Sequence, residues 1–347
     1  MSGTWENQNK VLPGAYINIR TNEPLSINLG DRGTVALLQE MSVGTDAKIY
    51  TITATSADWP DKATAADKFM AGEALKKAKT VLVYKLPKAH TAENVTTALA
   101  ALKTVDFNVL CYPYDGASEV ANQTAITAWI KAMRNDEGVK CQAVLANQVA
   151  DSEGIINVGN GVVMADGTAI TAAQTTAWVA GATAGASITT SNTCAVYVGA
   201  IDVSPRMTKT EMEAAITAGK FIFKVDSAQN VMAVYDINSL TSVTVDKGKA
   251  FTKNRLIRTL DNIANDVTKI FESSYVGKLN NNESGRSLLK ASLVEYFVTL
   301  QGMGAIQNFE TDDVVISAGV ASDAVVIAVN VQPVDSVEKI YITVNCS

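Results

Sequence analysis

The chain has 347 residues, of which 47% are hydrophobic and 18% are charged, and its formal net charge is −6. This length allows a sizeable core and two domains, and an acidic chain without a basic run is not expected to bind nucleic acid directly. The charged fraction lies below the usual quarter, which favours burial of the surface against other subunits over an ordinary globular protein with an uncharged surface.

The first predicted element is a short strand near the N-terminus. Ala15, Ile17 and Ile19 alternate with strand period and share one face. Chain termini usually fray unless something holds them, so an apolar terminal strand is expected to pair either with its own sheet or with a neighbour's. Residues 1–22 are therefore assigned to an N-terminal arm.

Residues 23–250 are predicted to form an α/β body with β-rich flanks. After short strands between residues 25 and 57, apolar strand-like runs alternate with helical segments, which indicates a mixed or mostly parallel central sheet with helices on its faces. The expected helices cover residues 63–79, 92–103, 119–134 and 172–185. The expected strands cover residues 81–86, 107–112, 140–146 and 155–164. A second β-rich stretch has expected strands at residues 195–201, 220–225, 231–236 and 242–245, and a short helix at 210–218.

Residues 251–332 are predicted to form a C-terminal part of the body that contains helices and strands. Two long helices are expected at residues 254–275 and 285–302, joined by an Asn-rich turn. In the first helix, apolar residues step by four and three positions and form a narrow seam. The seam consists of Leu256, Leu260, Ile263, Val267 and Ile270. We expect these residues to be the face that the helix buries against its partner helix and the sheet.

The chain ends in further predicted strands, at residues 314–317, 325–331 and 339–346. Ile340 and Ile342 share one face of the last strand. A proline cannot donate to a β-ladder, so Pro333 belongs in the connection before it. Residues 332–338 allow either a hairpin or a last strand that swings away to a neighbouring molecule, and residues 333–347 are assigned to a C-terminal arm.

The sequence contains no catalytic or phosphate-binding motif. His90 is the only histidine, and at the start of a predicted helix it is expected to face solvent rather than to act as a base. Gly159, Asn160 and Gly161 lack the Gly, Lys and Ser/Thr of a phosphate loop, so they indicate a bulge or a tight turn.

The remaining candidates are carboxylates and cysteines. Asp115 and Asp151 follow predicted strands and are expected to form turns or cap helices. Asp312 and Asp313 are expected to be solvated, with metal binding as the alternative. The cysteines have no metal-like spacing and are expected to be reduced; they are Cys111, Cys141, Cys194 and Cys346. We therefore expect a protein without a cofactor, a metal or an enzymatic activity.

Neither export nor membrane insertion is predicted. The first residues lack the charged and apolar regions of a signal peptide. No apolar run reaches the roughly 18 residues that a membrane span requires.

Four segments, two of them at the ends of the chain, together resemble one protein family. Residues 12–17 (LPGAYI) are similar to an N-terminal PGVY-(V/I) motif, and residues 178–185 (WVAGATAG) to an AGxxAG helix. Residues 254–260 (NRLIRTL) resemble the core helix of the same family. Residues 331–342 (VQPVDSVEKIYI) resemble its closing V-x-P-(V/A)-(D/E)-x-(I/V)-E-x-I-x-(I/V) pattern. The family is that of the contractile tail sheath proteins of bacteriophages and phage-tail-like bacteriocins.

The resemblance implies a structural subunit that forms six-fold rings stacked helically around an inner tail tube protein. It implies further contacts with baseplate and tail terminator proteins, assembly in the bacterial host cytoplasm, and a place in a virion tail or bacteriocin particle. Contraction of such a sheath drives the tube through the envelope of the target cell.

The resemblance also implies that terminal arms add strands to sheets of neighbouring copies, as in β-augmentation. The expected donor residues are Ala15, Tyr16, Ile17 and Ile19 in the first arm, and Ile340, Tyr341, Ile342 and Val344 in the second. The expected acceptor strand carries Val325, Ile327, Val329 and Val331. Hinges are expected at residues 20–24 and 332–336.

A tube-facing surface is implied near the long helices, with Arg286 and Lys290 as candidate contacts to an acidic tube and a solvated helix face as the alternative. Two other classes of function stay open for the chain as a whole. One is an α/β enzyme or small-molecule-binding protein that uses carboxylates, and the other is a non-contractile self-assembling tube or shell protein.

Overall fold

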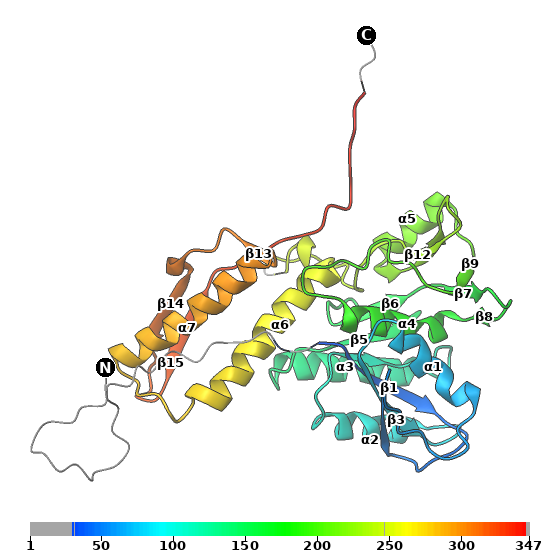
Figure 1. The fold of residues 1–347 in the computed structure, drawn as a ribbon, viewed down its shortest axis with the longest axis horizontal. Coiled ribbons are helices and arrows are strands. Elements are labelled where there is room, and N and C mark those ends of the chain that lie inside the picture. Colours follow the sequence, from blue (N-terminus) through cyan, green and yellow to red (C-terminus); the bar gives the residue numbers. More distant parts are fainter. Residues whose placement is uncertain (1–29, 31, 246, 345–347) are drawn as a thin grey trace, which may run out of the picture.

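The computed structural model describes residue 30, residues 32–245 and residues 247–344. They form an α/β lobe and an elongated C-terminal lobe, and the last residues extend away from both (Figure 1). The predicted fold class is confirmed, because the central sheet is mostly parallel and carries helices on both faces.

Seven strands form the central sheet in the order β10-β6-β5-β4-β1-β3-β2. All neighbours run parallel except β2 and β3. The strands are β1 (Thr34–Glu40), β2 (Ile49–Thr53), β3 (Thr80–Leu86), β4 (Val109–Cys111), β5 (Gln142–Ala146), β6 (Ile155–Val158) and β10 (Lys220–Phe221). Their apolar runs are continuous because both faces of the sheet are covered.

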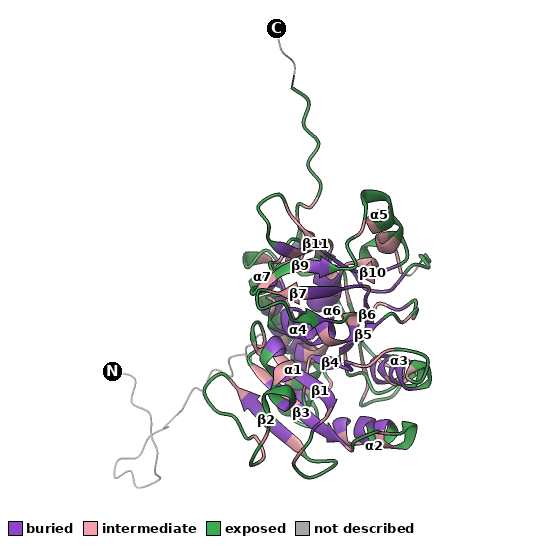
Figure 2. Ribbon diagram, turned by 90° about the vertical axis from the view of Figure 1, so that its right-hand side faces the viewer, coloured by how far each residue is buried: buried purple, intermediate pink, exposed green. Residues whose placement is uncertain are grey.

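Successive residues of β1 enter opposite cores, as the period of two requires. Val35 and Leu37 pack with α1 (Ala65–Leu75) and α4 (Ala172–Gly185), whereas Ala36 and Leu38 pack with α2 (Ala92–Leu102) and α3 (Val120–Asn135). Figure 2 shows how much of the sheet is buried between these helices. Thr91 caps α2 as the sequence predicts, since its side chain accepts from the backbone N–H of Asn94.

Smaller sheets extend the α/β lobe. One contains β7 (Gly161–Met164), β8 (Ala169–Ile170) and β9 (Ala200–Ser204). Another pairs β11 (Phe223–Val225) with β12 (Val231–Ala233), and α5 (Lys209–Thr217) lies beside them. The predicted strand at 242–245 is wrong: the backbone N–H groups of Thr241 and Ser242 bind the side chain of Asp151 instead of a neighbouring strand.

The C-terminal lobe is built on two long helices. The first, α6 (Asn254–Ile270), ends in a π-helical turn (Phe271–Tyr275), and α7 (Glu283–Gly302) follows it. The strands are β13 (Ile306–Gln307), β14 (Val314–Ala318), β15 (Val325–Val329) and β16 (Gln332–Pro333), and 3₁₀ turns cover Lys249–Thr252 and Thr311–Asp313.

Helix α6 lies between the α/β lobe and α7 (Figure 1), and both of its faces are covered. Ile263, Val267 and Ile270 of the predicted seam pack against the core around α7. All five seam residues are only half-buried, however, and all the fully buried positions of α6 except Ile257 are polar. The sequence did not predict this polar burial, because an amphipathic helix usually directs its polar face to water.

Candidate subunit interface

Strands β14 and β15 form an isolated antiparallel hairpin, the predicted acceptor for an exchanged strand. Val314 pairs with Val329 and Ile316 with Ile327. Among the described residues no third strand pairs with either member, so both edges of the hairpin are open. A two-stranded sheet is marginal alone, and this one is supported on one face by the core around α7.

The two faces of the hairpin differ in burial. The expected acceptor residues Ile327 and Val329 pack against the α7 core, as does Val331 beyond the end of β15. Val315 and Val326 lie on the outer face and are more than half exposed. The hairpin therefore offers open backbone edges together with exposed apolar side chains.

The C-terminal arm leaves the body as an extended segment (Figures 1 and 2). Residues 339–344 form no strand. Tyr341 is 89% exposed and Ile342 is 78% exposed. The hairpin that the sequence left open does not form, because β16, directly after β15, pairs with β13. The expected N-terminal donors Ala15, Tyr16, Ile17 and Ile19 lie outside the described residues.

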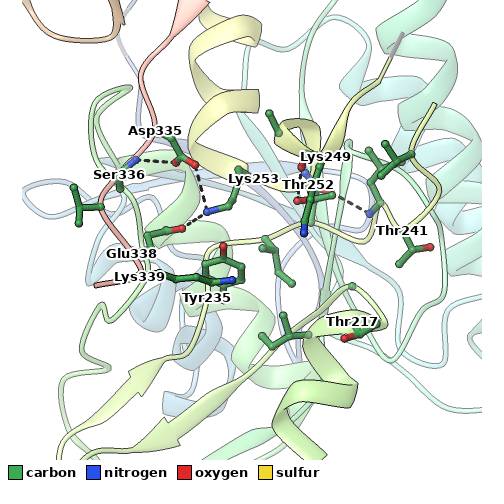
Figure 3. A pocket seen from close by; sticks show the side chains of 18 residues that line it. Thr217, Tyr235, Thr241, Lys249, Thr252, Lys253, Asp335, Ser336, Glu338 and Lys339 are labelled. Atoms are coloured by element: carbon green, nitrogen blue, oxygen red, sulfur yellow. Dashed lines mark hydrogen bonds and ion pairs between the residues drawn. The ribbon is translucent and has the colours of Figure 1, made fainter. Parts of the chain in front are cut away.

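The root of the C-terminal arm is held by a carboxylate, Glu338 (Figure 3). Its Oε1 accepts hydrogen bonds from Ser191 Oγ at 2.9 Å and Thr193 Oγ1 at 2.6 Å. Its Oε2 pairs with Lys253 Nζ, and its side chain is only 6% exposed. Asp335 also approaches Lys253, at 3.4 Å, but remains half exposed.

Lys253 is the cation at the centre of this cluster. Burial acts to lower the pKa of its ammonium group, but the hydrogen bond and charge of Glu338 outweigh burial, so the pKa is raised above its usual range. Its ammonium also lies 4.3 Å from the centre of the Tyr235 ring. The stabilising contribution of Lys253 is present at neutral pH and is lost only as pH rises through this raised value.

A groove of about 980 Å³ opens beside the arm root (Figure 3). Its walls include apolar Ile216, Leu240 and Val337, together with Lys253 and Glu338. The expected hinge at residues 332–336 is in contact with the body in this structure. Its contacts are the β13–β16 pairing, the Val334 N–H bond to Ala305 O, and the Arg255 bond to Ser336 Oγ. Glu338 lies in the closing motif, but nothing local in the sequence indicates this role, because its partners are remote in the chain.

The two candidate tube contacts lie on the first turns of α7. Arg286 donates to Asn281 Oδ1 at 2.9 Å, and Asn281 in turn donates to Ala324 O at the hairpin turn. Arg286 and Lys290 are both half-buried. Arg286 is therefore linked through Asn281 to the turn of the β14–β15 hairpin.

The solvent-facing position expected for His90 is wrong. Its side chain is 4% exposed, because strands β1 and β4 end beside it at the carboxyl edge of the sheet. Nδ1 lies 2.7 Å from Glu40 Oε1, and Nε2 lies 2.7 Å from Tyr112 Oη and 3.6 Å from Glu119 Oε2. Tyr112 donates its own hydroxyl hydrogen to Glu119 and accepts a hydrogen bond from Asn122.

The cluster around His90 contains two carboxyl groups and one imidazole. Burial acts to raise the pKa of Glu40 and of Glu119, but hydrogen bonds from His90 to Glu40, and from Tyr112 and Asn122 to Glu119, lower both values. Burial raises the pKa of Tyr112 far above its usual range. The cluster thus contains two ionised carboxylates around the single imidazole.

The other candidate residues have local structural roles. Asn147 donates to Asp115, and hydrogen bonds from Ser242 and Thr241 lower the pKa of Asp151. Asn160 binds both the N–H and the C=O of Phe223, which makes the Gly159–Gly161 segment a turn that joins two sheets. Asp313 accepts from the N–H of Glu310.

The described part of the chain has neither a cluster of metal ligands nor an exposed, activated thiol at Cys111 or Cys141. No group of three or more His, Cys, Asp or Glu side chains there is arranged to hold a metal. Cys111 and Cys141 are buried, which raises the pKa of each thiol to about 12. Across residue 30, residues 32–245 and 247–344, no helix has the length and apolarity to cross a bilayer.

Two family models match the chain in succession. The phage tail sheath protein central domain matches residues 88–239, and the phage tail sheath C-terminal domain matches residues 246–347. The phage-like element PBSX protein XkdK of Bacillus subtilis is 37% identical over 265 residues, which are 74% of this chain and 56% of the relative. The tail sheath protein of Clostridium phage phiCD119 is 34% identical over 206 residues, 59% of this chain and 56% of the relative. The chain therefore spans little more than half the length of these curated relatives.

Solved structures are similar over nearly the whole chain. The sheath tail protein from Desulfitobacterium hafniense has a TM-score of 0.82 and 34% identity, with 95% of this chain and 99% of that chain covered. The helical sheath of the anti-feeding prophage in its contracted state has a TM-score of 0.75 and 15% identity, with 97% and 100% covered. At that identity the second likeness concerns the fold alone.

Proposed function

Because this chain belongs to the phage tail sheath family, we propose that it is the repeating subunit of a sheath that surrounds an inner tube. The members of the family are structural proteins, and the chain is a structural protein rather than an enzyme. The observation that carries the proposal is the exposed apolar arm of residues 339–344 on a body that also has a hairpin with open edges.

Assembly is proposed to proceed by strand exchange between copies. Ile340, Tyr341, Ile342 and Val344 of one copy add to the hairpin of another, and β15 is the acceptor. Such pairing satisfies open backbone groups, and the alternating side chains fix the register. Residues 1–22 provide a second donor, with Ala15, Tyr16, Ile17 and Ile19 as its strand. Because donor and acceptor are different surfaces, the contacts continue as a helix instead of closing in a dimer.

Contraction is proposed as the mechanical activity of the assembled sheath. The strand joints keep neighbouring subunits connected while their bodies rotate and gain contacts. If each subunit buried a further ~200 Å² of apolar surface, it would gain about 5 kcal/mol, and many subunits together would drive the tube through the target envelope. Baseplate and terminator proteins are the proposed partners at the two ends, in a phage tail or bacteriocin particle assembled in the host cytoplasm.

Deletion of residues 339–347 tests the exchange directly. We expect a folded monomer with an unchanged thermal unfolding midpoint, since residues 339–344 contact little of the body, but no cylinders in negative-stain micrographs. A truncation of residues 1–19 should behave in the same way.

The matched controls are single charges in the arm. Ile342→Lys should prevent cylinder formation, whereas Thr343→Lys, on the opposite face of the strand, should allow it. Normal cylinders from either truncation would refute strand exchange. Smooth tubes that never shorten would favour the non-contractile alternative.

A further inference from the structure

Gly30, at the start of the described chain, and the root of the C-terminal arm are both attached to one helix, α6. At the N-terminal side, the backbone N–H of Gly30 donates to Asp266 Oδ1 at 2.9 Å. A Cβ at Gly30 would lie 2.4 Å from the same oxygen, so an alanine there would displace the carboxylate group from this position. At the C-terminal side, Glu338 pairs with Lys253, directly before α6, and Arg255 of its first turn binds Ser336.

Asp266 is well placed to act as an anchor. Burial raises the pKa of its carboxyl group despite the hydrogen bonds it receives. Asp266 Oδ2 accepts from Tyr296 Oη of α7 at 2.9 Å and from Asn262 Nδ2 at 2.7 Å. The carboxylate therefore ties the start of the described chain to two helices at once.

Helix α6 is itself fixed to the α/β lobe through its polar face. Arg258 pairs with Asp236 at 2.9 Å, and both side chains are fully buried. Arg134 of α3 holds Asp261 through two bonds of 2.6 and 2.8 Å. Breaking a buried pair is costly, so these contacts prevent the helix from sliding or rotating against the lobe.

We propose that α6 is a strut that sets the distance and orientation between Gly30, where the described chain begins, and the root of the C-terminal arm, with Asp266 and Glu338 as the residues that position them. This inference rests on the proposed strand exchange. At 1.5 Å per residue, the anchors at residues 253 and 266 are separated by roughly 20 Å of rigid helix. A displacement of the C-terminal arm root is then transmitted along α6 to Gly30 without bending the body.

The first test uses the unassembled protein. Spin labels are placed at Lys339→Cys and at Glu295→Cys, an exposed site on α7, with Cys194 and Cys346 replaced by serine. Glu338→Ala should at least double the width of the measured distance distribution, and Glu338→Gln should widen it less. The matched control is Asp335→Ala, which removes the half-exposed partner of the same lysine and should leave the distribution unchanged. An unchanged distance distribution in Glu338→Ala would show that Glu338 does not position the root of the C-terminal arm.

The second test uses assembled cylinders. Glu338→Ala and Gly30→Ala should each abolish ordered cylinders or change their helical repeat, while Gly248→Ala, where an added Cβ meets nothing within 4 Å, should not. If deletion of 339–347 leaves cylinders intact, the strand exchange itself is wrong. If that deletion abolishes cylinders but Glu338→Ala and Gly30→Ala assemble with the normal repeat, exchange stands and the strut is wrong.

Discussion

The hydrogen bonds around His90 fix the orientation of its ring. The ionised Glu40 can only accept, so the Nδ1 of His90 donates to it. Nε2 lies 2.7 Å from the hydroxyl oxygen of Tyr112, which is itself bonded to Glu119. The buried ring thus links the end of β1 to the residue that follows β4.

The two carboxylates of this cluster should make the protein less stable as the pH falls into the acid range. The folded-state pKa values of Glu40 and Glu119 are lowered. Their contribution is therefore present above the ordinary glutamate pKa of about 4.3 and is lost as pH falls through the folded-state values. In urea unfolding, Glu119→Gln should reduce the loss of stability between pH 6 and pH 3.

At the scale of elements, the contact between α1 and α4 depends on glycine. A Cβ at Gly181 would lie 2.1 Å from the backbone oxygen of Ala74, and one at Gly185 would lie 1.9 Å from that of Lys77. These distances allow no side chain, because the obstacle is backbone. In the family motif at residues 178–185, these two glycines therefore allow α4 to pack directly against the backbone of α1 and the residues after it.

Substitution of these glycines should separate the two helices. Gly181→Ala should lower the free energy of unfolding by about 1–3 kcal/mol, the usual cost of overpacking, as measured by urea denaturation. Gly72→Ala on the facing helix α1 is the control, since nothing lies within 4 Å of its added Cβ. It should raise stability by about 0.5–1 kcal/mol through better helix propensity. Equal effects of the two substitutions would argue against the close contact.

Elements with strong local patterns could be predicted from the sequence, and elements decided by distant partners could not. The structure confirms α4 at residues 172–185 and the Thr91 cap because spacing and capping chemistry are local. The polar face of α6 was missed because Asp236 and Arg134, which bury Arg258 and Asp261, are remote in sequence. The buried position of His90 and the role of Glu338 could not be predicted for the same reason: their partners come together only in the folded chain.

At the scale of the whole molecule, the tube-facing surface stays a prediction. Arg286 and Lys290 lie one turn apart on α7 and are the proposed contacts to an acidic tube. Reversal of both charges to glutamate should weaken co-assembly with the tube protein in sedimentation assays, while cylinders of the sheath alone still form. Lys209, on the exposed helix α5, provides a control reversal that should leave tube binding intact. Loss of sheath cylinders in the double variant would assign the two cations to contacts between subunits.

The exposed C-terminal arm also affects how growth of a polymer can begin. Fixing residues 339–344 as a strand costs roughly 1–2 kcal/mol per residue in backbone entropy. Pairing with the hairpin of one other subunit adds only a single ladder of hydrogen bonds to offset this cost. We therefore expect two free subunits to associate weakly. A subunit that docks on an existing ring places its arm and its body in contact at the same time, so the lattice should elongate readily from a template and seldom nucleate by itself.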